Sequence, residues 1–149
     1  MKIRIEIAPD EPEEIIIRTK ELSDTVCRIQ EAVKSITSEE VRLVLKKDDV
    51  QYFPDTDSIL FFETTQSGVC AHTANEVFDC DYKLYELVSI LPRSFIRVSK
   101  STIINTNHVY SVNRNLTASS IVEFRNSHKK VYVSRGYYKE FMARLEEKR

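Results

Sequence analysis

The sequence predicts an α+β fold with mostly antiparallel strands and short helices, preceded by a small N-terminal β-α extension. From Val41 onward, short apolar runs alternate with turn formers such as Pro54-Asp55 and Ser67-Gly68, which is the spacing of a β-meander. Helical spacing of apolar residues interrupts this pattern over 82–91 and closes the chain over 136–148. A separate strand-then-helix pattern occupies the first 40 residues.

The N-terminal 40 residues predict two strands and one helix. Isoleucines alternate with charged residues over 1–9, which is typical of a half-buried strand, and residues 13–18 predict a second strand. Thr19 is the candidate N-cap of a helix whose apolar stripe consists of Leu22, Val26, Ile29, Val33 and Ile36. We expect this stripe to pack on the chain's own sheet, with dimerisation as the alternative, and the unit to end near residues 37–40.

The remaining residues predict ten strands and two helices. Strands are expected over 41–47, 50–53, 58–64, 69–73 and 76–80, and a helix over 82–91 is stopped by Pro92. Further strands are expected over 95–98, 101–105 and 108–112, and a hairpin over 119–125 and 129–135. The closing helix presents Tyr138, Phe141, Met142 and Leu145 to the core.

Length and composition favour an ordinary globular protein with one domain, or one domain and an extension. Of its 149 residues, 42% are hydrophobic and 30% charged, and only 2 are glycine. No apolar run approaches the ~18 residues of a membrane helix, and acidic residues interrupt any signal-peptide pattern. The three cysteines (Cys27, Cys70, Cys80) lack a C-x-x-C motif, which predicts the reducing cytoplasm and leaves a Cys70–Cys80 pair across a hairpin open.

The charges are segregated along the chain. Residues 1–92 carry 10 basic and 19 acidic residues, whereas residues 93–139 carry 9 basic residues and one acidic residue, Glu123. A local basic face matters more for binding a polyanion than the total charge, which is −1. The alternative is a scatter of separate solvated cations.

The sequence contains no recognisable catalytic or metal-binding motif. His72, His108 and His128 lie far apart, and neither H-E-x-x-H nor a Cys/His cluster occurs. Two glycines cannot build a phosphate-binding loop, and G-x-S-x-G is absent. We therefore predict no enzyme, no cofactor and no metal.

Two basic clusters lie where predicted strands become loops. Arg97 and Lys100 interrupt the apolar run FIRVSKSTIIN, and Arg135 follows the strand KKVYV. Burying an unpaired cation costs several kcal/mol or more, so these side chains are expected at a surface. Cations flanked by serine hydroxyls suit phosphates and guanine edges. RNA binding ranks lower because the tyrosines alternate with core positions, and a protein–protein module that uses the acidic N-terminal half is the other alternative.

Three stretches resemble the LytTR DNA-binding domain family, over roughly residues 41–149. They are ILFFET at 59–64, YKLYELVSILPRSFIRVSKSTIINTNHVYSV at 82–112, and KKVYVSRGYYKEFMARL at 129–145. The block 91–113 and the VSR motif at 133–135 carry the specific similarity to the family pattern F-x-R-x-H-R-S-x-x-V-N. The resemblance implies an elongated β-fold of a bacterial transcription regulator whose loops enter successive major grooves of DNA.

The resemblance also implies roles for individual residues. Arg135 and Lys100 match base-contacting positions, Ser101 matches a backbone-contacting serine, and Arg97 matches the first arginine of the motif. Ser99 stands where the family usually has histidine, and Asn105 matches a structural turn residue.

The remaining expected DNA contacts come from one turn and from three further basic residues. The turn TTQSGV lacks the basic residue or histidine that other members often send into the groove, so Gln66 or Ser67 is the expected contact there. Arg114, Lys129 and Lys130 complete the expected DNA-binding set, the two lysines through phosphates.

The resemblance further implies a stand-alone regulator with residues 41–149 as its DNA-binding domain. Residues 1–40 are too few for a receiver domain and carry no phosphoacceptor pattern, so we expect an extension that packs or dimerises. The expected partner is double-stranded DNA with repeated half-sites, bound by a homodimer or by two adjacent copies. Control by a partner protein such as a membrane protein, or by the regulator's abundance, is expected from the resemblance alone.

Overall fold

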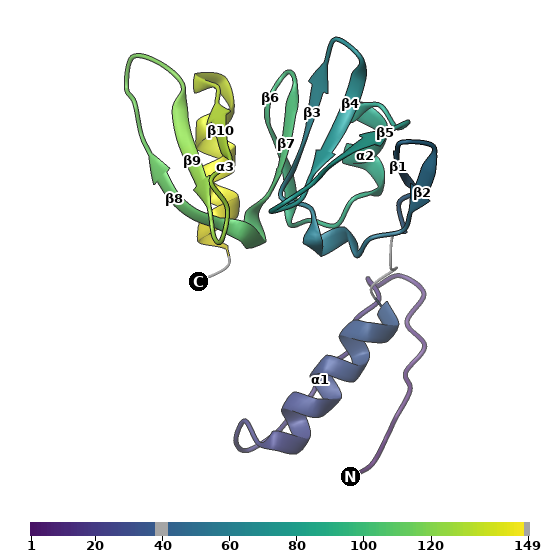
Figure 1. Ribbon diagram of the computed structural model, residues 1–149. Helices are drawn as coiled ribbons and strands as arrows, with labels where there is room; N and C mark the ends of the chain where they lie inside the picture. Colours follow the sequence, from purple (N-terminus) through teal and green to yellow (C-terminus); the bar gives the residue numbers. More distant parts are fainter. Residues whose placement is uncertain (38–41, 148–149) are drawn as a thin grey trace. The chain divides into compact units, whose positions relative to one another are not determined.

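A computed structural model describes residues 1–37 and 42–147 of the chain (Figure 1). The chain divides into two compact units, Met1–Glu40 and Val41–Arg149. Each unit is described below by itself.

The first unit contains one regular element, helix α1 (Asp24–Thr37), within described residues 1–37. The strands predicted over 1–9 and 13–18 are wrong, because residues 1–23 form neither strand nor helix. Alternating apolar residues specify a strand only when a neighbouring strand and an apolar surface are available, and here Ile3, Ile5 and Ile7 are exposed.

The predicted N-cap of α1 is also wrong. Thr19 lies five residues before the first residue of the helix, and its hydroxyl donates to the carbonyl of Glu21 at 2.8 Å. Ser23 precedes the helix, and its Oγ accepts a hydrogen bond from the Val26 N–H at 3.3 Å. The expected end of the unit at residues 38–40 lies outside the described residues.

The second unit contains two antiparallel sheets. The larger has the strand order β2-β1-β5-β4-β3-β7-β6, and the smaller has the order β10-β9-β8. The strands are β1 (Leu45–Lys47), β2 (Val50–Tyr52), β3 (Phe61–Thr65), β4 (Gly68–His72), β5 (Val77–Cys80), β6 (Phe95–Ser99), β7 (Thr102–Asn105), β8 (Val109–Asn113), β9 (Ser120–Phe124) and β10 (Lys130–Val133). The helices are α2 (Leu84–Ile90) and α3 (Arg135–Glu146), with 3-10 turns at Thr56–Ser58 and Thr106–His108.

Two apolar cores explain the continuous apolar runs of the central strands. Phe62 and Ile103 are neighbours in the β3–β7 pairing and enter a core that α2 covers through Leu84 and Leu87. The next pair, Phe61 and Ile104, enters a second core on the opposite face. Because both faces of β3 and β7 are buried, both faces need apolar residues.

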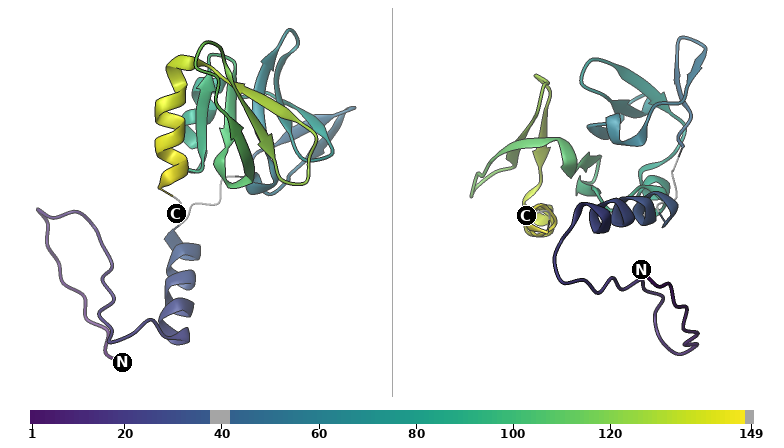
Figure 2. Two further views of the ribbon diagram at one scale, coloured as in Figure 1. Left: turned by 90° about the vertical axis from the view of Figure 1, so that its left-hand side faces the viewer. Right: turned by 90° about the horizontal axis from the view of Figure 1, so that it is seen from below.

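The second core joins the two sheets and α3. Val98 of β6 shares it with Val122 of β9, Val133 of β10 and Phe141 of α3. Figure 2 shows α3 running beside these strands. This packing fixes the ends of β6, β10 and α3 relative to one another.

The three cysteines are free thiols. In the β4–β5 pairing Cys70 lies opposite Asp79, and Val69 lies opposite Cys80. Since successive side chains alternate between the two faces of a sheet, Cys70 and Cys80 project from opposite faces. A disulfide between them would require a register shift of one residue.

Candidate nucleic-acid interface

A β-bulge at the end of β6 ties the start of α3 to the sheet. The β6–β7 register shifts between Arg97 and Ser99, so the intervening Val98 has no partner in β7. The Val98 carbonyl instead accepts a hydrogen bond from the Ser134 N–H at 2.9 Å. The junction between β10 and α3, including Arg135, therefore lies beside the β6–β7 turn.

A second backbone bond brings the β3–β4 turn to the same place. The Thr64 N–H donates to the Ser101 carbonyl at 2.8 Å, just beyond the β3–β7 pairing. Three connections far apart in sequence thus converge at the upper end of the domain in Figure 1. We call this surface the loop rim; it comprises Gln66, Ser67, Ser99, Lys100, Ser101, Ser134 and Arg135.

The Arg97 side chain is hydrogen-bonded to the backbone of the β6–β7 turn. The half-buried side chain donates from Nε to the Ser99 carbonyl at 3.2 Å and from Nη2 to the Lys100 carbonyl. Charged donors make strong hydrogen bonds to carbonyl oxygens. The guanidinium thereby fastens the backbone that carries Lys100 and Ser101.

Two serines complete the turn. The Ser101 N–H donates to Ser99 Oγ at 3.2 Å, and the two hydroxyl oxygens lie 3.3 Å apart. Such side-chain-to-backbone bonds stabilise tight turns. Ser99, at the position where the family pattern has histidine, thus has a local structural partner.

Two cations of the rim are unengaged. Lys100 and Arg135 are exposed, and their side chains have no hydrogen-bond or ion-pair partner within the described ranges. Arg135 is also the first residue of α3, whose N-terminal end carries a partial positive charge. The rim is therefore electropositive and open to solvent.

The loop between β8 and β9 adds a further cation beside the rim. The guanidinium of Arg114 lies 4.9 Å from the centroid of the Tyr138 ring, in the first turn of α3. Lys139 follows Arg135 by four residues, so both lie on one face of α3. Sequence reasoning missed Lys139, although this spacing after the VSR motif was available as a signal.

Lys129 and Lys130 lie at the opposite end of β10 from Arg135. Lys129 Nζ lies 3.2 Å from His72 Nδ1 and donates to the Glu76 carbonyl at 3.0 Å. Lys130 Nζ lies 3.6 Å from a carboxylate oxygen of Glu123, in an exposed pair. The structure does not bring these two lysines to the loop rim.

His72 links Lys129 to the larger sheet. Its ring stacks on Phe61 with centroids 4.2 Å apart, and its Nε2 lies 2.8 Å from Glu63 Oε1. Because a protonated lysine only donates, Nδ1 accepts from Lys129 and Nε2 carries the proton donated to Glu63. Burial lowers the pKa of His72 below its ordinary value of 6.5, and it also lowers the pKa of Lys129.

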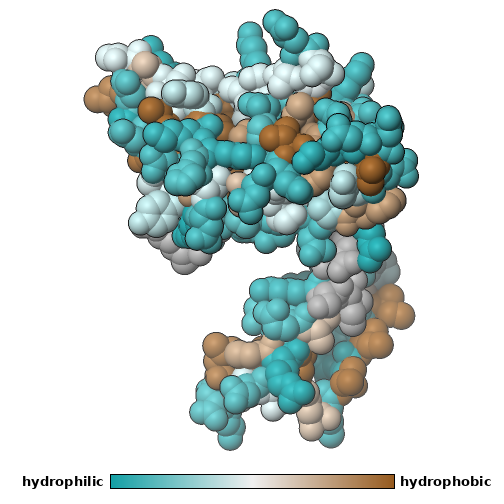
Figure 3. Space-filling view, in the orientation of Figure 1, coloured by the Kyte–Doolittle hydropathy of each residue, from teal (hydrophilic) through white to brown (hydrophobic). Residues whose placement is uncertain are grey.

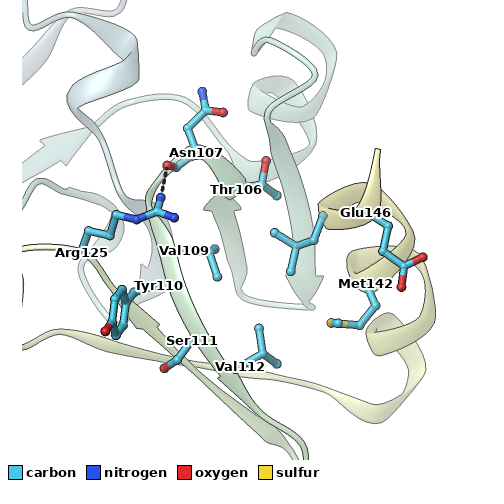
Figure 4. Close-up of a pocket in the computed structure, with 10 residues that line it drawn as sticks. Thr106, Asn107, Val109, Tyr110, Ser111, Val112, Arg125, Met142 and Glu146 are labelled. Carbon is cyan, nitrogen blue, oxygen red and sulfur yellow. Dashed lines mark hydrogen bonds between the residues drawn. The ribbon is translucent and has the colours of Figure 1, made fainter. Parts of the chain in front are cut away.

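A groove of about 480 Å³ lies at the C-terminal half of α3, away from Arg135 (Figure 4). Val109, Val112 and Met142 line its apolar part, and Arg125 beside it donates to the Asn107 carbonyl at 3.1 Å. The lining contains no histidine or cysteine, and Glu146 is its one carboxylate. This lining does not assemble a nucleophile with a general base.

Two absences hold for the part of the chain that the structure describes. No group of three or more His, Cys, Asp or Glu side chains is placed to hold a metal ion. No helix in this part is long and apolar enough to cross a membrane.

A basic rim of exposed loops is the electrostatic feature expected of a nucleic-acid-binding domain. The model of the LytTr DNA-binding domain matches residues 49–146. The chain belongs to the LytTR family and is a DNA-binding transcriptional regulator.

Relatives and a solved structure agree with this assignment. A Staphylococcus aureus (strain NCTC 8325) protein named an uncharacterized HTH-type transcriptional regulator is 30% identical over 146 residues, covering 97% of this chain and 98% of the relative. A protein of the same description from strain MRSA252 is 32% identical over 110 residues, covering 73% and 74%. The LytTr DNA-binding domain of a Bacillus cereus methyl-accepting/DNA response regulator shares the fold, with a TM-score of 0.66 and 23% identity over 72% of this chain and 98% of that one.

Proposed function

We propose that the loop rim reads double-stranded DNA sequence-specifically in the major groove. Lys100 and Arg135 are the base-contacting residues in this proposal, because both are exposed and unengaged within the described ranges. The observation that carries it is the pair of backbone bonds, Ser134 to Val98 and Thr64 to Ser101, which hold the rim together. Arginine and lysine donors match the acceptors of guanine in the major groove.

Strand-end loops and the N-terminal end of α3, rather than the recognition helix of a helix-turn-helix motif, carry the contacts in this proposal. The relatives are named HTH-type, but α2 and α3 are separated by β6 to β10, and no two α-helices are consecutive in residues 42–147. A helix-turn-helix motif needs two helices joined by a short turn. The exposed cations Lys100 and Arg135 lie instead at a turn between strands and at the N-terminal end of α3.

Phosphate contacts are assigned to residues at the edges of the rim. Ser101 and Arg114 are exposed, and Lys139 extends the positive face of α3. Gln66 and Ser67 are exposed in the β3–β4 turn, and they offer an amide and a hydroxyl to DNA. Lys129 is given a structural role because its amino group already has two partners.

We include binding to spaced half-sites by a homodimer, or by two adjacent copies, in the proposal. Single DNA-binding modules bury only ~600–1,000 Å² of protein surface, which limits affinity and specificity. A second module that engages a second half-site raises the overall affinity through avidity. Control by a partner protein, including a membrane protein, also belongs to the proposal and rests on the family resemblance.

The proposal is tested by selecting bound fragments from a random double-stranded DNA library with the purified full chain. We expect recovered fragments to share a spaced repeat, and a labelled repeat to bind more tightly than its scrambled version at equal salt concentration. A scrambled duplex that binds equally well would reject sequence-specific reading. Failure to bind any DNA at low salt would favour the protein–protein alternative, and preference for single-stranded RNA would favour the RNA alternative.

A further inference from the structure

The loop between β8 and β9 presents a large apolar side chain to solvent. This loop, residues 114–119, consists of polar or small residues apart from one leucine, Leu116. The side chain of Leu116 is 71% exposed. Figure 3 shows apolar surface at the upper left of the domain, where Figure 1 draws this loop. A single exposed leucine is ordinary on a protein surface, so its position decides whether it has a function.

The register of the smaller sheet places this loop beside Arg135. Ile121 of β9 pairs with Asn113 of β8 on one side and with Tyr132 of β10 on the other. Both β8 and β10 are antiparallel to β9, so they run toward the same end of the sheet, where β8 leads into the loop and β10 leads to Arg135. Because neighbouring strands lie about 4.8 Å apart, the two strand ends are separated by roughly 10 Å.

Two sets of contacts fix the conformation of the loop. At its start, the guanidinium of Arg114 lies 4.9 Å from the centroid of the Tyr138 ring of α3. The Asn115 N–H donates to Oγ of the buried Ser120 at 3.2 Å. Asn115 Oδ1 accepts from the Thr117 N–H at 3.1 Å and from the Thr117 hydroxyl at 3.2 Å, which closes a tight turn around the leucine. A side chain presented by a fixed turn loses less conformational entropy when it binds.

The chemistry of DNA limits what this leucine can contact. The loop carries no acidic residue, and Arg114 is exposed, so the loop attracts the phosphate backbone. Base edges in the major groove present hydrogen-bonding groups and one apolar group, which is the C5-methyl group of thymine. Successive base pairs are stacked about 3.4 Å apart, so roughly 10 Å along the groove corresponds to about three base pairs.

We propose that Leu116 contacts the C5-methyl group of a thymine about three base pairs from the base that Arg135 contacts, and thereby adds to the sequence preference of this regulator. The inference rests on the proposed function, because it requires the loop rim to lie in the major groove. It names a determinant of specificity that is apolar, whereas the rim contributes cations, hydroxyls and an amide.

Replacing thymine by uracil tests the contact, since it removes the methyl group and keeps the base pair. The probe is a duplex recovered from the random library, prepared as a series in which uracil replaces one thymine at a time. Anisotropy titrations should find a position where the wild-type chain binds the uracil duplex about fourfold more weakly, which corresponds to the loss of one buried methyl group. Leu116→Ala and Leu116→Asn should bind the two duplexes with equal affinity. Leu116→Met keeps an apolar side chain and should retain a preference for thymine.

Val88→Ala is the matched control, because Val88 is an apolar residue that is 54% exposed on α2. This variant should prefer the thymine duplex as strongly as wild type does. Comparing variants on the same two duplexes also cancels any effect of uracil on the DNA itself. The ratio of the two affinities should stay constant between low and high salt, because an apolar contact releases no counterions.

Two results would overturn the inference: no uracil replacement weakens binding by the wild-type chain, or Leu116→Ala and Leu116→Asn keep the full preference at the sensitive position. The proposed function would survive either result as long as the selected duplex still binds more tightly than its scrambled version. Equal binding of the selected and scrambled duplexes by the wild-type chain would instead reject the proposed function and this inference together.

Discussion

The two ends of strand β10 both carry basic residues, but in different structural settings. At its C-terminal end, Arg135 is exposed and unengaged within the described ranges, beside Lys100. At its N-terminal end, Lys129 bonds to His72 and the Glu76 carbonyl, and Lys130 pairs with Glu123. The end with engaged lysines joins the two sheets, whereas the end with free cations faces solvent.

A count of basic residues therefore does not define a DNA-binding surface. Lys129 contributes to the positive charge of residues 93–139 exactly as Arg135 does in the sequence. Its amino group nevertheless satisfies acceptors of the protein itself. What separates the two roles is whether protein groups already occupy the donors.

The largest effect is expected from Arg135→Ala. If Arg135 reads a base edge, its loss should reduce the discrimination between specific and scrambled duplexes by about 1–3 kcal/mol. Lys130→Ala is the matched control at the other end of β10 and should retain full discrimination. Fluorescence anisotropy titrations of both duplexes at one salt concentration measure the difference. Equal losses of discrimination in the two variants would contradict the different roles assigned to the two ends of β10.

Arg97→Ala should weaken the support of the rim. Loss of its bonds to the Ser99 and Lys100 carbonyls should lower the free energy of unfolding by about 1–2 kcal/mol and also weaken DNA binding. Arg125→Ala is the control, because Arg125 bonds to the Asn107 carbonyl beside the groove. It should lose stability with unchanged DNA affinity, as measured by urea denaturation and anisotropy. Unchanged DNA binding by Arg97→Ala would argue against its supporting role.

A smaller effect is expected from Lys139→Ala. Removing one phosphate contact should reduce the steepness of the dependence of log affinity on log salt concentration by about one unit, for specific and scrambled duplexes alike. Lys130→Ala should leave this slope unchanged. Titrations at four salt concentrations measure both slopes, and a change confined to Lys130→Ala would reverse the assignment of the two ends.

The smallest expected effect is a pH dependence of protein stability that arises from His72, which contacts Lys129 at the N-terminal end of β10. Because burial lowers the pKa of His72 below 6.5 in the folded protein, the unfolded chain takes up a proton first as the pH falls. The free energy of unfolding should therefore decrease as the pH drops below about 6.5, until the folded-state pKa is reached. Denaturation at pH 7 and pH 5 should show a smaller decrease for His72→Gln than for wild type. An equal decrease in the free energy of unfolding of both proteins would show that a group other than His72 titrates.

The sequence predicted the strands of the second unit well, because their patterns are local. The alternation over 95–105 and the hairpin over 119–135 correspond to β6, β7, β9 and β10. Two expected strands start later in the structure: the strand expected over 41–47 is limited to Leu45–Lys47 among the described residues, and the strand expected over 58–64 begins at Phe61.

Features that depend on distant residues could not be predicted in this way. The strands expected over 1–9 and 13–18 have the right pattern but no partner within the described unit. The bulge at Val98 matters because Ser134, 36 positions later, donates to it, and no local pattern encodes that bond. The engagement of Lys129 likewise depends on His72 in β4 of the other sheet and on Glu76 in the loop before β5.

The Ser134–Val98 bond has a consequence for attempts to reprogram this regulator. Transplanting the VSR motif alone into a related scaffold would move the arginine without the bulge that orients it. Chimeras that exchange residues 97–101 together with 133–139 would keep both partners of the bond. Altered operator preference should therefore be easier to engineer by exchanging these two segments as one cassette than by changing either of them singly.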